Sequence, residues 1–507
     1  MKRALVIALA IVMLFSNISY GQVVGFNGGI KDDYLYKEVV FVTGRPIVVE
    51  GEVEIDIDED KDMINTRYRY ELSNPEEDVR VERRVSYVTN LYKKEEKNQT
   101  VATTSVDSFS EKITVGDDRY NLGDYQLSRS IVYDNRPAVK FYSGNLTGKK
   151  TYYINGRDSR RNEGTVTIET NGDTIVGYDH YWGASETYIL TQDINSKRNV
   201  VYTDVYGEQK EEVIEWDGLV TLKLSSTDTK DFSYIRNEPT NISFRGGLLQ
   251  TEKQENILQY EYDMPEFDDD GFPDNYDRNR DEENIRMDTV PVHKRLVIPN
   301  LKDIRGHWAE ENIFNLYSLE VFDNPSPYFG PKLPMTRAEF AKAIVRAIAV
   351  LQEEEDAERR RRRNRNEVEE KKIFEDVEKE DDKYKYVKFV KEKGIMKGVS
   401  EHFFAPNGVL TRAQAVTILI RALGLESLAP NPPYRTHFID DEEIPLWAKD
   451  AIYVANEIGL IKGDPYGRVN PNEPMSKAEA ATFIYRFIKH MKDEITVDYR
   501  ERILNNH

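Results

Sequence analysis

The chain has 507 residues, of which 39% are hydrophobic and 32% charged, and its formal net charge is −20 at pH 7. This length exceeds one ordinary hydrophobic core and predicts two or more domains. The acidic balance argues against nucleic acid or an anionic membrane as the main partner, because both would repel such a surface. There is no cysteine, which excludes disulfides, thiol catalysis and a lipid-bearing cysteine.

The N-terminus has the features of a secretory signal peptide. A basic start precedes an apolar run at residues 4–15 that is too short to cross a bilayer, and the small residues Ser19 and Gly21 suit a cleavage site. We therefore predict a signal peptide at residues 1–21 and favour it over an uncleaved anchor helix. No later segment reaches transmembrane length, so the sequence predicts export without a membrane anchor.

Residues 22–262 are expected to form a β-rich surface region. Segments such as EVVFV, TRYRYEL and TVTIET alternate in polarity and are rich in Val, Ile, Thr and Tyr. The dipeptides at 155–156, 171–172 and 217–218 are Asn-Gly, Asn-Gly and Asp-Gly, which predict tight hairpin turns. We expect one or two antiparallel β domains of sandwich or barrel type.

This β region offers little catalytic chemistry, and we expect no catalytic residue in it. Its single histidine is His180, so a histidine metal site or a Ser-His-Asp triad is hard to build. A glycosidase carboxylate pair is the alternative, and Glu215 with Asp217 is one example. An aromatic cluster beside the histidine could stack on sugars but is more typical of a core or strand surface: Tyr178, Tyr181 and Trp182.

Residues 263–297 are acidic and poor in aliphatic residues, which predicts a linker. Five carboxylates within it occupy positions 1, 3, 5, 9 and 12 around Gly271, and the segment resembles the calcium loops of thrombospondin type 3-like repeats. Hard oxygen ligands alternate there, and the glycine permits a sharp turn. We favour a calcium site over a plain linker, with the ligands Glu266, Asp268, Asp270, Asp274 and Asp277.

From about residue 298 the hydrophobic period changes to that of helices, and the sequence repeats internally. The segment MTRAEFAKAIVRAI returns as LTRAQAVTILIRAL and as MSKAEAATFIYRFI. A charged stretch between the first two copies lacks an apolar stripe and is expected to be a solvated helical insertion. The expected boundaries are 298–351, 373–426 and 437–491 for the repeats, 352–372 for the insertion and 492–507 for a C-terminal tail.

Each repeated segment begins a helix with a capping box, at residues 336–339, 411–414 and 476–479. The residue after each cap is a cation, although the positive end of the helix dipole should disfavour a cation there. Two interpretations are open. The cation pairs with a carboxylate of a neighbouring repeat, or it joins the exposed helix N–H groups in an anion site. The three cations are Arg337, Arg412 and Lys477.

The repeats resemble a known family. The order H-W-A, G-φ-φ-K-G, F-x-P-N and T-R-A-E-F-A, where φ is an apolar residue, is that of S-layer homology modules, and the resemblance covers about residues 298–491. It implies an all-α bundle of three repeats with pseudo-threefold symmetry. It also implies grooves that bind an acidic or pyruvylated secondary cell-wall polysaccharide.

The resemblance also implies which residues bind this polymer. The first copy departs from the pattern because it lacks the G-φ-φ-K-G loop, and the second copy lacks the tryptophan. In the third copy, lysine loses the bidentate fork of arginine. We therefore expect one or two working grooves, and we favour core packing over sugar contact for both tryptophans. The implied residues are Arg337, Arg412, Lys477, Trp308, Trp447, Lys397, Gly398, Lys462 and Gly463.

Together these features predict an exported surface protein without enzymatic activity, held at the cell wall non-covalently by its C-terminal repeats. The β-rich region would be a structural or interaction module, with other surface-layer subunits as further expected partners. The alternatives are an enzyme that degrades polysaccharide and carries the same anchor, or a surface adhesin or carbohydrate-binding protein.

Overall fold

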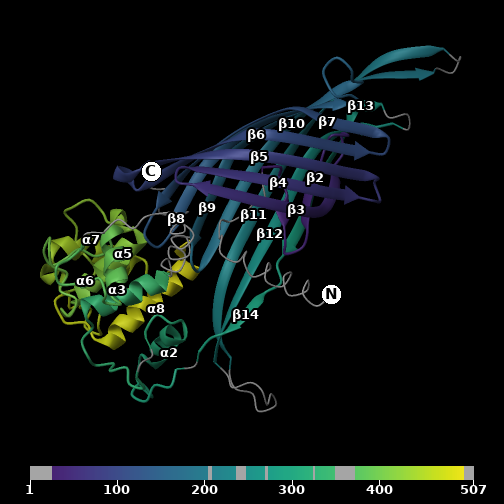
Figure 1. Ribbon diagram of the computed structural model, residues 1–507. Helices are drawn as coiled ribbons and strands as arrows, with labels where there is room; N and C mark the ends of the chain where they lie inside the picture. The colour runs from purple at the N-terminus through teal and green to yellow at the C-terminus, as the bar shows by residue number, and fades with distance from the viewer. Residues whose placement is uncertain are drawn as a thin grey trace, which may run out of the picture.

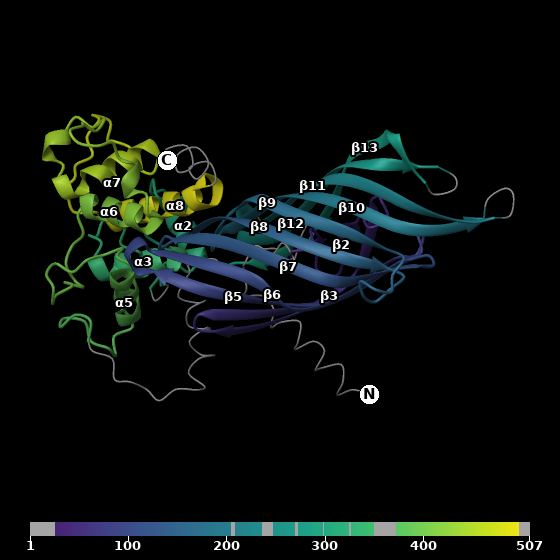
Figure 2. The same cartoon turned by 90° about the horizontal axis from the view of Figure 1, so that it is seen from above.

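The computed structural model describes residues 26–203, 208–235, 247–268, 272–297, 299–323, 326–348 and 372–495. A long, curved β-sheet is followed by a helical bundle that lies at one end of the sheet (Figures 1 and 2). The predicted signal peptide, the C-terminal tail from residue 496 and all of the charged insertion except Lys372 lie outside the described residues. No helix among the described residues is long and apolar enough to cross a membrane.

The described part of the β region is all antiparallel, as predicted, and its strands form one 14-stranded sheet. Each strand pairs with the next one along the chain, and the last strand, β14, returns to pair with β12. The strands are β1 (Ile30–Lys31), β2 (Tyr36–Val40), β3 (Ile47–Asp60), β4 (Met63–Asn74), β5 (Val79–Lys94), β6 (Gln99–Val115), β7 (Asp118–Asn135), β8 (Lys140–Ile154), β9 (Gly164–His180), β10 (Gly183–Thr203), β11 (Gln209–Ile235), β12 (Gly247–Phe267), β13 (Pro273–Asp288) and β14 (Val292–Arg295).

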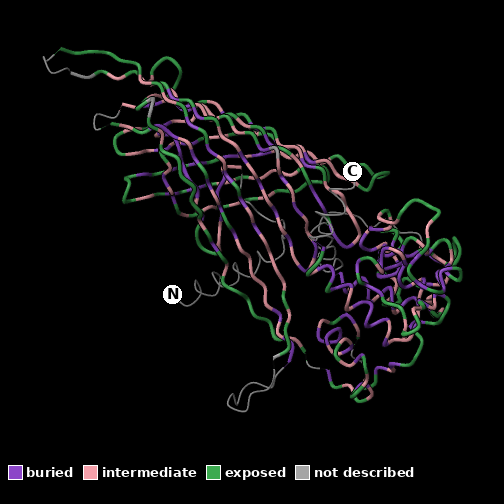
Figure 3. Tube along the Cα trace, turned by 180° about the vertical axis from the view of Figure 1, so that it is seen from behind, coloured by how far each residue is buried: buried purple, intermediate pink, exposed green. Residues whose placement is uncertain are grey.

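The sheet curves so that its first strand returns to β12. The Asn256 side chain on β12 donates a 2.7 Å hydrogen bond to the carbonyl of Lys31 on β1. The concave face carries the core, because alternate residues of each strand point to one side, and its largest buried side chains are tyrosines such as Tyr70 and Tyr152. Exposed charged residues such as Glu52, Glu54 and Asp56 alternate with core residues on β3. Buried and exposed residues alternate along the strands in Figure 3.

The prediction of a linker at residues 263–297 is wrong, because most of this segment belongs to the sheet. β12 extends to Phe267, and β13 and β14 follow it. Opposite charges from neighbouring strands pair at this edge: Asp263 contacts Arg278 at 2.5 Å and Arg280 at 2.8 Å. A highly charged strand is typical of a sheet edge, where it discourages further strand pairing.

Two of the three predicted hairpin turns are wrong. Residues 171–172 lie within β9 at an irregularity in its pairing with both neighbouring strands, and residues 217–218 lie inside β11. A Cβ atom on Gly218 would lie 2.3 Å from the sulfur of Met264, so close contact with β12 requires the glycine. Only Asn155, with a φ of 51°, lies directly after the end of a strand.

Among the described residues, the helical bundle has two main helices per repeat. The first helix of each repeat packs against the second helix of another: α5 on α3, α7 on α6 and α2 on α8. The predicted capping boxes are present, since each cap hydroxyl accepts the N–H three residues later. The helices are α2 (Glu310–Ser318), α3 (Arg337–Ile348), α5 (Tyr384–Glu392), α6 (Arg412–Leu423), α7 (Leu446–Glu457) and α8 (Lys477–Asp493), with short 3₁₀ helices η2 (Glu95–Lys97), η3 (Glu426–Leu428) and η4 (Asp441–Glu443).

Three backbone hydrogen bonds join the repeats in a ring. The N–H of Met335 donates to Met475, the N–H of Met475 to Leu410, and the N–H of Leu410 to Met335, at 2.8, 2.8 and 3.0 Å. These residues immediately precede the three helix caps, so the ring brings the starts of α3, α6 and α8 together.

The sheet docks directly onto the bundle, and one hydrophobic core spans both. Trp182, at the β9–β10 turn, is 3% exposed, and its indole N–H donates a 2.8 Å hydrogen bond to the carbonyl of Ala347 at the end of α3. Nearby, the N–H of Ala138 donates to the carbonyl of Ala422 on α6 at 2.9 Å. Trp182 therefore packs in a core, the interpretation that the sequence favoured.

Candidate functional site

The starts of the three capped helices form the first part of the candidate site. In α3, the N–H groups of Arg337 and Ala338 donate to the carbonyls of Gly408 and Pro406, at 2.9 and 3.0 Å. The first two residues of α6 and α8 donate in the same way to loops of the third and first repeats. The N–H groups that the anion-site interpretation requires to be exposed are therefore occupied by the neighbouring repeat.

Arg337 lies in the boundary between the first and second repeats and is 7% exposed. Its Nε donates to the carbonyl of Phe404 at 2.9 Å, and its Nη2 donates to the carbonyl of Lys397 at 2.7 Å. Burial lowers the pKa of the guanidinium, while Asp376 raises it. No carboxylate forms an ion pair with Arg337 among the described residues, so Asp376 compensates this charge only from beyond ion-pair distance.

The other two cations pair with carboxylates of the next repeat, which is one of the two interpretations that the sequence left open. Arg412 lies 2.6 Å from Glu479, and Lys477 lies 2.7 Å from Glu339. Both carboxylates occupy the third position of a capped helix. The corresponding residue of the second repeat is Gln414, an uncharged amide, so the ring offers Arg337 no equivalent partner.

The loop residues Lys397 and Gly398 lie beside Arg337, because the Lys397 carbonyl accepts from its guanidinium. A Cβ on Gly398 would lie 2.3 Å from the carbonyl oxygen of Ser400, so the loop requires glycine there. Lys397 itself is exposed. In the third repeat, Lys462 and Gly463 are both exposed.

The predicted burial of the motif tryptophans is wrong. Trp308 is 65% exposed before α2, and Trp447 is 53% exposed at the start of α7. Neither ring belongs to the core, because the helices bury the small residues Ala309 and Ala448 beside them instead. The two rings are therefore accessible to a ligand on the surface of the bundle.

An aspartate that sequence reasoning missed recurs in every repeat. Asp440, for example, accepts the N–H groups of Val469 and Asn470 at 2.9 and 2.7 Å. In the first repeat burial opposes ionisation of Asp303, yet two such backbone N–H groups hold its pKa below the usual value. The signal was the recurrence of an aspartate near the start of each copy. The set is Asp303, Asp376 and Asp440, and each holds the loop ahead of a capped helix.

The acidic turn between β12 and β13 contains the expected calcium ligands. Glu266 and Asp274 face each other across the two strands, and Asp268 accepts the N–H of Phe272 at 2.8 Å. Asp274 accepts the N–H of Asp277 at 3.3 Å. Asp270 lies outside the described residues, and the residues that are described form no group of three metal-ligating side chains.

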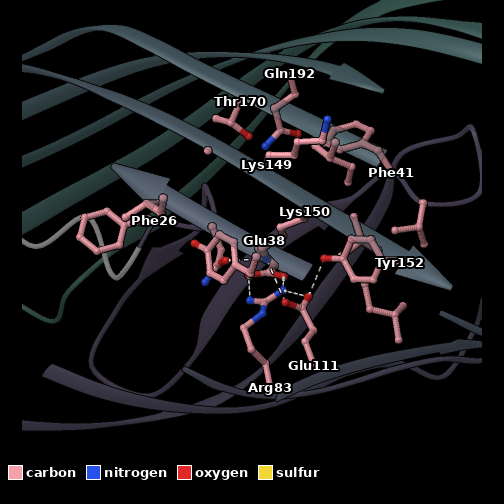
Figure 4. Close-up of a pocket in the computed structure, with 18 of the residues that line it drawn as sticks. Phe26, Glu38, Phe41, Arg83, Glu111, Lys149, Lys150, Tyr152, Thr170 and Gln192 are labelled. Atoms are coloured by element: carbon pink, nitrogen blue, oxygen red, sulfur yellow. Dashed lines mark hydrogen bonds and ion pairs between the residues drawn. The ribbon is translucent and has the colours of Figure 1, made fainter. Parts of the chain in front are cut away.

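The concave face of the sheet holds a second polar cluster, shown in Figure 4. Arg83, which is 4% exposed, contacts Glu38 at 2.6 Å and Glu111 at 2.8 Å, and Lys150 contacts Glu111 at 2.9 Å. Burial opposes ionisation of Glu111, but Arg83 and Lys150 lower its pKa to about 2. The adjoining cavity of about 50 Å³ is too small for a sugar ring, so we interpret this cluster as structural.

The residues singled out in the sequence of the β region have structural partners. His180 is buried, which lowers its pKa to about 3, and its Nδ1 accepts the N–H of Trp182. Glu215 is exposed and pairs with Lys197. Asp217 is exposed and lies 3.4 Å from Arg278 on β13.

Comparison with known proteins gives matches to all three repeats. The model of the S-layer homology domain matches residues 300–341, 373–416 and 438–481. The surface-layer 125 kDa protein of Lysinibacillus sphaericus is 29% identical over 213 residues, which are 41% of this chain and 16% of that protein. The S-layer protein EA1 of Bacillus anthracis is 28% identical over 180 residues, 35% of this chain and 19% of that protein.

An enzyme is also among the relatives. An endoglucanase of Bacillus sp. (strain KSM-635) is 29% identical over 133 residues, which are 26% of this chain and 13% of that protein. The chain therefore spans less than a fifth of the length of each of these three relatives.

Proposed function

Because this chain is an extracellular, cell-wall-associated protein that carries three S-layer homology domains, we propose that these domains hold it at the wall by binding an anionic polysaccharide. The polymer would be a secondary cell-wall polysaccharide with carboxylates, such as pyruvate ketals. The β region would be a structural or interaction module of the surface layer. The ring of backbone hydrogen bonds supports a pseudo-threefold arrangement of the domains.

The observation that carries this proposal is that the Arg337 guanidinium has no ion-pair partner among the described residues. Two of its nitrogens donate to carbonyls, while Nη1 has no partner among the described residues. A polymer carboxylate would supply the missing negative charge and form a charge-assisted hydrogen bond. Lys397, whose carbonyl contacts this guanidinium and whose side chain is exposed, would add a second positive charge to the attraction. We therefore assign the first binding groove to the boundary between the first and second repeats.

A second, weaker groove would lie between the second and third repeats. Arg412 is already paired with Glu479 there, so a polymer carboxylate would have to compete for its guanidinium. The exposed ring of Trp447 and the loop at Lys462 and Gly463 belong to the same pair of repeats. Two weak grooves on one polymer would still hold firmly through avidity.

The test is co-sedimentation of the purified full chain with cell walls. We expect it to pellet with intact walls and to stay in solution after the polysaccharide has been chemically removed. The double substitution of Arg337 and Arg412 by Ala should have the same effect on binding to intact walls. Sedimentation that survives both treatments would refute the proposal.

For the β region, the rival function is polysaccharide hydrolysis, because one relative is named an endoglucanase. Release of reducing sugar from purified wall polysaccharide or from cellulose by the full chain would support this rival. An adhesive role predicts binding of the chain to cells without any release of sugar.

We also propose that the acidic turn between β12 and β13 binds calcium. Carboxylate oxygens at alternating positions are the ligands that calcium prefers, and Glu266 and Asp274 face each other across the strands. In this position the ion would stiffen the edge of the sheet.

A further inference from the structure

The concave face of the sheet holds a cavity of about 330 Å³ that none of the functions above uses. Residues of strands β3 to β10 line it, together with Phe26 from the segment before β1. It is far larger than the 50 Å³ cavity beside Arg83, and it lies in the size range of small-molecule sites. None of its lining residues belongs to the S-layer homology domains.

Aromatic rings provide much of the cavity lining. Phe26, Tyr68 and Tyr133 are half-buried, so parts of their rings are open to a ligand. Tyr142, which also lines the cavity, packs against Tyr133 with ring centroids 5.3 Å apart and restricts that ring. Rings that are fixed in this way offer flat apolar surface without a large loss of side-chain entropy on binding.

Polar groups lie among these rings. Arg129 donates from Nη2 to the hydroxyl of Tyr188 at 2.6 Å and lies 3.8 Å from Glu186. Its Nε is buried and has no hydrogen-bond partner among the described residues. Since a buried donor without an acceptor is unfavourable, a ligand oxygen that reached it would satisfy it.

The charges of the lining cancel. Arg129, Lys93 and Lys140 carry three positive charges, and three carboxylates, Glu59, Asp179 and Glu186, carry three negative charges. A strongly charged ligand would find no complementary field in such a cavity. The lining therefore combines apolar rings with both donors and acceptors but has no net charge.

We propose that this cavity binds a neutral carbohydrate. A pyranose ring presents an apolar C–H face that can stack on an aromatic ring, and its hydroxyls both donate and accept hydrogen bonds. An uncharged sugar thus matches all three properties of the lining, whereas a fatty acyl chain would leave the Nε of Arg129 without an acceptor. This site is independent of the wall-binding grooves.

The experiment is isothermal titration calorimetry of the purified full chain with maltotriose and chitotriose, two neutral trisaccharides, and with laurate as an apolar probe. We expect saturable binding of at least one trisaccharide, and binding at least tenfold weaker in Tyr133→Ala. Thr66→Trp should also weaken it, because it fills the cavity without removing a ring. The matched control is Tyr92→Ala, since Tyr92 follows the lining residue Leu91 but is 56% exposed outside the cavity.

Circular dichroism melting of each variant separates loss of the site from loss of the fold. Arg337→Gln should leave trisaccharide binding unchanged, which distinguishes this site from the wall-binding grooves. The proposal is overturned if neither trisaccharide binds, if only laurate binds, or if binding persists unchanged in folded Tyr133→Ala and Thr66→Trp variants.

Discussion

Arg412 and Glu479 lie 2.6 Å apart across the boundary between the second and third repeats, whereas Arg337, at the same position of the first repeat, has no carboxylate partner among the described residues. This difference arises from the residue at the third position of each capped helix. Glu occupies the third helical position of the first and third repeats, and Gln414 occupies it in the second. The repeats are therefore chemically unequal, and the first boundary has a cation without an ion-pair partner among the described residues.

The Lys477–Glu339 pair predicts a pH-dependent stability. Burial opposes ionisation of Glu339, but hydrogen bonds from Lys477 and Thr336 lower its pKa below the ordinary 4.5. A carboxylate whose pKa is lowered in the folded state stabilises the protein above its unfolded pKa, and this contribution is lost as pH falls through the folded pKa. Glu339→Gln should therefore cost about 1 kcal/mol at pH 7, because the pair is partly exposed, and progressively less below pH 4.5.

Urea unfolding of the wild type and this variant between pH 7 and pH 3 measures the difference. Glu401→Gln, at an exposed position of the second repeat, is the control and should show no such dependence. A Glu339→Gln effect of constant size across this pH range would contradict the prediction.

Glu320→Gly should stabilise the protein by about 1 kcal/mol. Glu320 follows α2 with a φ of 59°, in the left-handed region that disfavours side chains. The equivalent residues of the other repeats are Gly394 and Gly459, with φ values of 70° and 71°. Denaturant unfolding measures the gain, and Glu320→Ala separates backbone strain from charge, because it removes the carboxylate but keeps the Cβ. Equal stabilisation by both substitutions would attribute the effect to charge.

The junction between sheet and bundle should depend on the indole of Trp182. Trp182→Phe leaves the buried carbonyl of Ala347 without its donor, which should cost about 1–3 kcal/mol. Differential scanning calorimetry should then show the bundle melting apart from the sheet. Trp216→Phe is the control, since Trp216 is half-buried on β11 and its indole N–H has no partner among the described residues. An unchanged thermogram for Trp182→Phe would show that the junction does not couple the two parts.

Calcium binding to the acidic turn is the fourth prediction. Titration of the full chain should show a dissociation constant of about 0.1–1 mM, the range of extracellular calcium modules. Asp268→Ala should weaken it strongly, while Asp193→Ala, at an exposed position of β10, should not. If calcium causes neither heat of binding nor a change in protease sensitivity, the turn does not bind calcium.

Local features of the fold could be read from the sequence, because they depend on a few adjacent residues. The capping box of Thr411 and Gln414 is one example, since its two hydrogen bonds close within four residues. The strand β13 is the opposite case. Its charged side chains find partners such as Asp263 on β12, and composition alone favoured a linker.

The sequence was enough to predict which residues contribute to the candidate site, but not which of them form ion pairs. Arg337 and Lys397 were both expected to contribute, and the structure places them together. Which cation meets which carboxylate depends on the order of the repeats around the ring, and adjacent residues do not encode this order. The exposure of Trp308 was missed for a similar reason, because an amphipathic pattern does not show whether other elements cover a residue at the start of a helix.

Wall binding at the boundary between the first two repeats is tested by comparing the affinity of three full-chain variants for purified cell walls by co-sedimentation. Arg337→Gln should weaken binding at least tenfold, equivalent to about 1.4 kcal/mol. Arg412→Gln should weaken it less, because Glu479 already neutralises that cation. Lys397→Ala, which changes only an exposed side chain, should weaken binding without altering the melting temperature. Unchanged affinity in both Arg337→Gln and Lys397→Ala, with the fold intact, would contradict the assignment of the groove.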